Sequence, residues 1–170
     1  MALDSEGEDR VMSREVRRVP KDWSHPKDDR GSYRPLYDAD YETEADAWVQ
    51  GFMAWEGGKD PDRNETSCRY YWEWHSGPPE EGCYRPSWTD QERTHYQMYE
   101  TTSEGTPISP VMPSPEELAL WLTDNHANAG AGMTATYSQW LRVCQGHKAP
   151  SLIFSGGRIM SGVEGMEEIA

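Results

Sequence analysis

The sequence has little of the aliphatic material from which most protein cores are built. Leu, Ile, Val and Phe contribute seven, four, seven and two residues, 20 of the 170 in the chain. A content of about 12% is typical of disordered proteins. Eight Trp and nine Tyr residues indicate the opposite, because each ring buries roughly 150–250 Å² and keeps a polar group that needs a partner. We therefore expect a folded, aromatic-rich core held partly by side-chain hydrogen bonds.

Cysteines and long apolar runs are also scarce. Three Cys residues, an odd number, in a chain without a secretory apolar segment indicate reduced thiols. No stretch approaches the ~18 apolar residues of a membrane-spanning helix. These absences predict a cytoplasmic protein without a membrane partner.

Signatures of catalysis and of phosphate binding are missing as well. The chain has no G-x-S-x-G elbow, no P-loop and no G-x-G-x-x-G motif. A metal set of Cys68, His75 and Cys83, with His95 as a fourth ligand, lacks the closely spaced pairs of structural zinc sites. We therefore expect no metal and no cofactor, assign no catalytic residue and lean against an enzyme.

Basic charge is scarce over most of the chain, whose formal net charge is −14. Residues 1–9 hold four acids and no base, residues 10–36 hold eight bases and four acids, and the remainder holds eight bases and 22 acids. Such an acidic body repels nucleic acids and lipid headgroups but attracts basic proteins. The alternative is that the acids keep a Trp-rich protein soluble.

Aromatic periodicity and capping residues predict about three helices. Aromatic residues at helical spacing predict a first helix over residues 41–56, ended by Gly57-Gly58. Ser114 as N-cap with Pro115 behind it begins a second helix. A third is predicted from Thr136 to Gln145.

Short antiparallel strands complete an α+β class. The β-prone stretches at residues 68–74 and 94–102 predict two strands, and Ser155-Gly156-Gly157 predicts a hairpin. We expect a charged N-terminal arm over residues 1–19, in which Val16 and Val19 form an edge strand. A single domain then spans residues 20–165, and residues 166–170 form an acidic tail.

One segment occurs twice, 51 residues apart. Residues 22–38 (the first YRP segment) and residues 73–90 (the second) align Trp with Trp, Gly with Gly and Tyr-Arg-Pro with Tyr-Arg-Pro. The matched residues stiffen and anchor a loop, whereas the residues between them differ in charge. We therefore expect two similar loops that pack on one aromatic core and do not share a ligand.

Two sets of residues are candidates for binding. In the YRP segments, Trp, Tyr and Arg are typical either of a protein-binding hot spot or of a structural cation–π clasp; these are Trp23, Tyr33, Arg34, Trp74, Tyr84 and Arg85. The hydroxyl-rich stretch before the second helix offers either a preformed binding loop or a rigid connection. Its candidates are Glu100, Ser103, Glu104, Thr106 and Ser109.

Three phrases of the sequence are similar to a known group of proteins. These are "VPKDWSHP", "YETTSEGTPISPV" and "PEELALWL", within a likeness that covers roughly residues 14–143. The chain resembles a family of small bacteriophage and prophage proteins to which no enzymatic activity is assigned. The resemblance implies a setting, a phage accessory protein in the bacterial host cytoplasm, and transfers no catalytic residue.

Setting and charge together predict a non-enzymatic protein that binds a host or phage protein with a basic surface. An inhibitor of a nucleic-acid-handling defence complex, such as a CRISPR effector, fits this description without touching nucleic acid directly. One alternative is a small enzyme or ligand-binding protein with a pocket between the YRP segments and the TSEGTPISP loop, residues 102–110. Another is a structural or assembly protein of the virion. The sequence indicates no particular oligomeric state.

Overall fold

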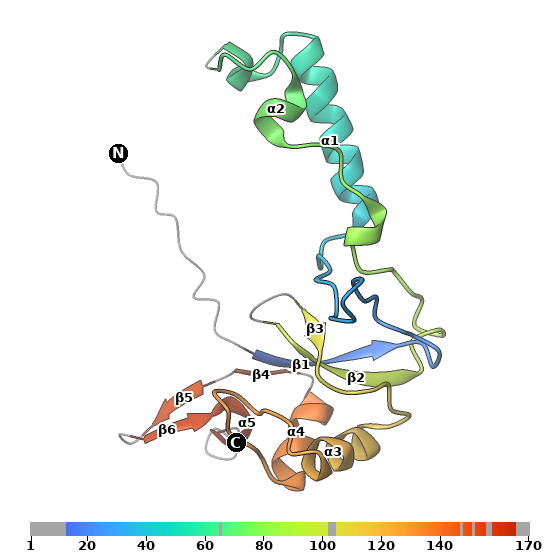
Figure 1. Ribbon diagram of the computed structural model, residues 1–170, viewed down its shortest axis with the longest axis vertical. Coiled ribbons are helices and arrows are strands. Elements are labelled where there is room, and N and C mark those ends of the chain that lie inside the picture. The colour runs from blue at the N-terminus through green and yellow to red at the C-terminus, as the bar shows by residue number, and fades with distance from the viewer. Residues whose placement is uncertain are drawn as a thin grey trace. The chain divides into compact units, whose positions relative to one another are not determined.

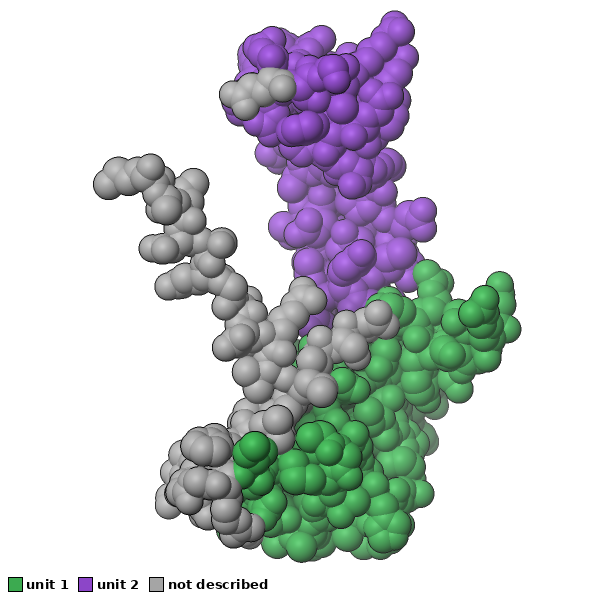
Figure 2. Space-filling view, turned by 60° about the vertical axis from the view of Figure 1, so that its left-hand side comes forward, with its two compact units in different colours: residues 1–35, 88–170 green, residues 36–87 purple. Residues whose placement is uncertain are grey.

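The protein divides into two compact units. The computed structural model describes residues 13–64, 66–101, 105–146, 148–150, 152–155 and 158–165. Unit 1 comprises residues 1–35 and 88–170, and unit 2 comprises residues 36–87 (Figure 2). Unit 2 is thus inserted into the chain of unit 1, where the sequence suggests one domain. The predicted α+β class is confirmed.

Unit 1 is built on a four-stranded antiparallel sheet with the strand order β3-β2-β1-β4. The strands are β1 (Ser13–Val19), β2 (His95–Glu100), β3 (Thr106–Pro107) and β4 (Lys148–Pro150). Strand β1 pairs with β2 over Arg14–Val19 but with β4 only over Ser13–Glu15. Val16 and Val19 therefore lie in a strand, as predicted, and have a paired neighbour on one side only. Residues 13–19 of the expected arm therefore belong to the sheet, and residues 1–12 lie outside the described residues.

Two helices cover one face of this sheet (Figure 1). Helix α3 (Pro115–Asp124) begins as predicted, because the Ser114 hydroxyl accepts the backbone N–H of Glu117 at 3.1 Å. Helix α4 (Tyr137–Gly146) is also confirmed. Their inward side chains form an apolar core with Val16 and Met98 of the sheet; the helix residues are Leu118, Ala119, Leu122, Trp140, Val143 and Cys144. Burial, with a smaller contribution from Glu116, raises the pKa of the Cys144 thiol to about 12.

The opposite face of the sheet carries a polar network under residues 20–35, the blue segment of Figure 1. The Tyr99 hydroxyl accepts the indole N–H of Trp23 at 3.0 Å and donates to Gln97 at 2.9 Å. His25 lies 3.4 Å from the same hydroxyl, and the guanidinium of Arg17 covers the Tyr99 ring at 4.4 Å. The predicted use of side-chain hydrogen bonds to hold aromatic residues is confirmed on this face.

A hairpin and a short helix end the described part of unit 1. Strands β5 (Leu152–Ser155) and β6 (Arg158–Ser161) pair antiparallel, as predicted. Helix α5 (Gly162–Gly165) follows and places Val163 against the core. The turn residues Gly156 and Gly157 and the predicted tail lie outside the described residues.

Unit 2 is a helical hairpin packed through aromatic rings. Helix α1 (Tyr41–Glu56) is confirmed, with the Asp40 carboxylate accepting the N–H of Thr43 at 2.9 Å and Gly57 as C-cap. The strand predicted over residues 68–74 is wrong, because residues Tyr71–His75 form helix α2. Short 3-10 helices lie at Pro61–Asn64 and Glu81–Cys83.

A parallel bridge joins the two ends of unit 2. The N–H of Tyr37 donates to the carbonyl of Cys83 at 2.8 Å, and the N–H of Arg85 donates to the carbonyl of Tyr37 at 3.0 Å. Arg85 also forms an ion pair with Asp38 at 3.5 Å. The inserted segment therefore begins and ends at neighbouring points.

Candidate functional site

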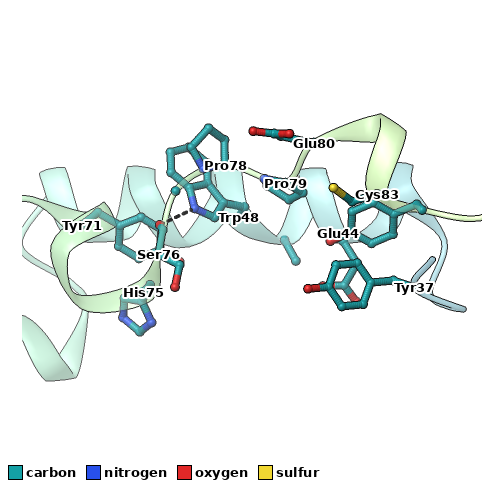
Figure 3. A pocket seen from close by; sticks show the side chains of 13 residues that line it. Tyr37, Glu44, Trp48, Tyr71, His75, Ser76, Pro78, Pro79, Glu80 and Cys83 are labelled. Carbon is teal, nitrogen blue, oxygen red and sulfur yellow. Dashed lines mark hydrogen bonds between the residues drawn. The ribbon is translucent and has the colours of Figure 1, made fainter. Parts of the chain in front are cut away.

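Unit 2 contains a cleft of about 510 Å³ between α1 and the segment that returns from α2. Figure 3 shows Tyr37, Glu44 and Cys83 at one end and Tyr71, His75 and Ser76 at the other. Trp48 and the pair Pro78-Pro79 lie between these ends; Ala47, Gly77, Glu80 and Tyr84 complete the lining. All of these residues belong to unit 2, so the cleft is a property of that unit alone.

The rings of the cleft are fixed by contacts on both helices. The indole N–H of Trp48 donates to the carbonyl of Ser76 at 3.2 Å, the dashed line in Figure 3. The same indole meets the buried Tyr71 ring edge-on, with centroids 5.4 Å apart. At the other end, the Tyr84 ring lies 5.2 Å from Tyr37 and 5.6 Å from Tyr41. Neighbouring aromatic contacts therefore hold the walls in place.

From Trp48 a row of stacked rings leads out of the cleft to the surface. The Trp48 and Phe52 rings stack at 5.6 Å, Phe52 and Trp72 at 6.4 Å, and Trp72 and Tyr70 at 4.7 Å. We call Trp48, Phe52, Trp72 and Tyr70 the aromatic row. Trp72 remains 45% exposed although it lies between two other rings.

Exposed apolar side chains are concentrated in unit 2. Ten large apolar side chains of the described residues are exposed, and six belong to this 52-residue unit: Tyr37, Val49, Met53, Tyr70, Trp72 and Trp74. The unit also carries 12 acids against four Lys and Arg residues, a formal charge of −8. Unit 2 thus combines exposed aromatic rings with a strongly acidic surface.

The first YRP segment packs on the sheet of unit 1. Trp23 is half-buried in the polar network and meets Trp88 at 4.8 Å. The Tyr33 ring packs edge-on against the His25 ring, with centroids 5.5 Å apart. The ammonium of Lys27 lies over the Tyr33 ring, 4.7 Å from its centroid, in a cation–π contact. The exposed Arg34 contributes its backbone carbonyl, to which His25 donates at 2.8 Å. The backbone of this segment is thus anchored to the sheet through His25.

The second YRP segment lies in unit 2 up to Ser87, so the two Tyr-Arg-Pro triplets do not share one aromatic core. Trp74 is 48% exposed on α2 and donates to the Asp62 carboxylate at 3.3 Å. Tyr84 lines the cleft, and Arg85 belongs to the bridge that joins the ends of the unit. The equivalent positions in the two segments therefore have different surroundings.

The hydroxyl-rich stretch makes structural contacts where it is described. Glu100 and Thr106 are paired partners in β2 and β3. The buried hydroxyl of Ser109 accepts the N–H of Met98 at 2.9 Å and donates to the carbonyl of Pro110 at 2.9 Å. Ser103 and Glu104 lie outside the described residues. None of the described residues of this stretch lines the cleft of unit 2.

One group of side chains has the geometry to hold a metal ion. Ligand atoms of Asp60, Asp62 and His75 lie within 4.8 Å of one another. The Asp62 carboxylate already accepts the Trp74 indole N–H and lies 3.9 Å from Nε2 of His75. Among the described residues, Cys68 and Cys83 do not join His75 in such a group.

Of the residues that line the cleft, the sequence predicts Tyr84 as a binding residue but does not predict Glu44, Trp48 or Glu80. Glu44 and Trp48 are four residues apart, a spacing that puts both on one face of a helix. The predicted helix over residues 41–56 could therefore have revealed an acid beside an aromatic ring. The return of Glu80 to that face depends on tertiary structure.

No family model, curated protein or solved structure matches this chain. Within the described residues, none of the helices combines the length and the hydropathy needed to cross a bilayer.

Proposed function

We propose that this protein acts without catalysis, by binding a host or phage protein with a basic surface, in the setting of a bacteriophage accessory protein. The observation that carries the proposal is the concentration of exposed aromatic rings on the acidic unit 2. Trp and Tyr are the residues in which binding hot spots are enriched. Exposed apolar side chains that lie together, as the stacked rings of Tyr70 and Trp72 do, are typical of a protein-interaction site.

Charge favours a basic partner over other binding partners. A formal charge of −8 on 52 residues repels the phosphates of nucleic acids and of lipid headgroups. The same charge accelerates association with a basic protein and strengthens it at low ionic strength. Nucleic-acid-handling defence complexes, such as CRISPR effectors, are a class of proteins with the required surface.

The test is capture of a defined partner from the lysate of a bacterial host by the full-length protein. We expect one saturable partner whose binding weakens as NaCl rises from about 0.05 to 0.3 M, because added salt screens exposed charges. The variant Trp72→Ser should weaken that binding at least about tenfold, as expected for a hot-spot residue. The matched control Leu120→Ser removes a similarly exposed apolar side chain from unit 1 and should bind normally.

Retained binding by Trp72→Ser would contradict the proposal, as would the absence of any saturable partner. Circular dichroism of both variants checks that each remains folded, so that lost binding reports on the surface and not on unfolding.

A further inference from the structure

The cleft of unit 2 has the chemistry of a site for a positively charged side chain. Its lining contains two carboxylates, Glu44 and Glu80, and no Lys or Arg. Its walls are aromatic or proline rings over most of their length (Figure 3). We infer that this cleft binds the side chain of a lysine or arginine residue presented by the partner protein. This inference rests on the proposed function and names the group that the protein recognises.

The first argument is the placement of negative charge. Glu44 lies in the first turn of α1 and Glu80 on the returning segment, so the two carboxylates approach the cleft from different elements. The pKa of the Tyr84 hydroxyl is raised by burial and, next, by the charge of Glu44. The field of Glu44 thus reaches the aromatic end of the cleft, where it favours a cation.

The second argument is the state of the aromatic faces. A cation is attracted to a ring when it lies within about 6 Å of the centroid. Elsewhere in the described residues this chain places its own Arg or Lys on four rings, including Tyr33 and Tyr99. Within the part of the chain that the structure describes, no Arg or Lys lies over the cleft rings Tyr37, Trp48 and Tyr84. Tyr37 is 64% exposed, which leaves its ring accessible to a cation from another protein.

The third argument is that the cleft is formed before any ligand arrives. Trp48 is held by its hydrogen bond to Ser76 and by the Tyr71 ring. Ser76 has φ 70°, a left-handed conformation that is uncommon for a residue other than glycine, and Pro78-Pro79 stiffens the segment that follows. Because these groups are already ordered, little conformational entropy is lost on binding.

The experiment uses the full-length protein and five-residue peptides with blocked ends, Gly-Gly-X-Gly-Gly, in which X is Arg, Lys, Gln or Glu. Binding is followed by NMR through the indole N–H resonance of Trp48, which lies in the cleft wall. We expect saturable shifts of this resonance with the Arg and Lys peptides, and at least about threefold weaker binding of the Gln peptide, as for one exposed charge pair. The Glu peptide should not bind.

Variants then test the site. Glu44→Gln with Glu80→Gln should weaken binding of the Arg peptide about tenfold, since each exposed carboxylate contributes a factor of a few. The matched control, Glu42→Gln with Glu81→Gln, alters net charge equally at exposed positions outside the lining. It should leave binding within about twofold, because these two carboxylates do not line the cleft and their exposed charges are screened by water and salt.

Equal binding of the Arg and Gln peptides would overturn the inference, and so would equal weakening by the two double variants. Either result leaves the Trp72-dependent capture of a partner intact, so the inference can fail while the proposed function stands. Conversely, selective binding of the Arg peptide without any saturable partner would contradict the proposed function alone.

Discussion

At the scale of single residues, His25 connects the first YRP segment to the sheet. Because the Arg34 carbonyl can only accept, Nε2 of His25 carries the proton of the 2.8 Å hydrogen bond. The other ring nitrogen faces the Tyr99 hydroxyl at 3.4 Å, and the ring is 4% exposed. Burial lowers the pKa of His25, opposed by the bond to Arg34 and assisted by the charge of Arg17. The low pKa therefore favours the neutral form of the His25 imidazole in folded unit 1.

This residue should make unit 1 sensitive to acid. Since the folded pKa lies below the ordinary value of 6.5, the unfolded state binds the proton more readily, and stability rises with pH. The contribution is complete above about pH 6.5 and is lost as pH falls below it. We expect the free energy of unfolding, measured by urea denaturation, to decrease from pH 7.5 to pH 5 by more in the wild type than in His25→Gln.

The difference between the two proteins isolates His25 from the carboxylates and the other histidines, because those groups titrate in both. Arg17 and Tyr99, which face the ring, are present in both proteins. Identical pH profiles for the wild type and the variant would contradict the assignment.

At the scale of elements, helix α2 shows why a β-prone sequence became a helix. The Glu73 carboxylate accepts the backbone N–H groups of Arg69 and Tyr70 at 2.9 and 3.0 Å, which supplies partners that a helix start otherwise lacks. Tyr71 and His75, four residues apart, then face the same way with ring centroids 4.6 Å apart. Packing on α1 therefore outweighed the intrinsic preference of Tyr and Trp for strands.

The approach of α2 to α1 depends on Gly51. A Cβ atom at this position would lie 2.0 Å from the hydroxyl oxygen of Tyr71 and 2.8 Å from its Cζ. Helix propensity alone would make Gly51→Ala stabilising by about 1 kcal/mol. We expect the reverse, a loss of about 1–3 kcal/mol in the free energy of unfolding of unit 2, because the buried ring must shift.

Chemical denaturation followed by near-ultraviolet circular dichroism, which reports on the Trp48 and Trp55 surroundings, measures this change. The control Gln50→Ala replaces the exposed preceding residue of the same helix and should change the stability by less than about 0.5 kcal/mol. A more stable Gly51→Ala protein would show that α1 and α2 do not pack through this glycine.

At the scale of the whole molecule, the repeated Tyr-Arg-Pro triplets mark the two passages of the chain between units. The division falls directly after Pro35 and again after Ser87. Within unit 1, Trp23 before the insertion contacts Trp88 after it. Within unit 2, Tyr37 and Tyr84 are bridged. In each unit, an aromatic pair therefore connects the segment near the first boundary with the segment near the second boundary.

This arrangement predicts that unit 1 folds without the insertion. Replacing residues 36–87 by about six Gly and Ser residues should leave cooperative thermal unfolding, because the sheet, α3 and α4 contain no residue of unit 2. Closing a short flexible loop should alter the free energy of unfolding by no more than about 2 kcal/mol. Calorimetry and the NMR amide spectrum measure the outcome, and a broad, non-cooperative transition would contradict it.

Elements whose signals are local could be predicted from the amino-acid sequence. Ser114 with Pro115 began α3, aromatic spacing located α1 and α4, and alternation located β2, because caps and periodicity act within a few residues. The two-sided pairing of β1, the helical state of residues 71–75 and the separation into two units were decided by the tertiary structure. The cleft was decided in the same way, because Glu44 and Glu80 become neighbours only when the chain returns along α1. Contacts between residues distant in sequence depend on packing, which local patterns do not encode.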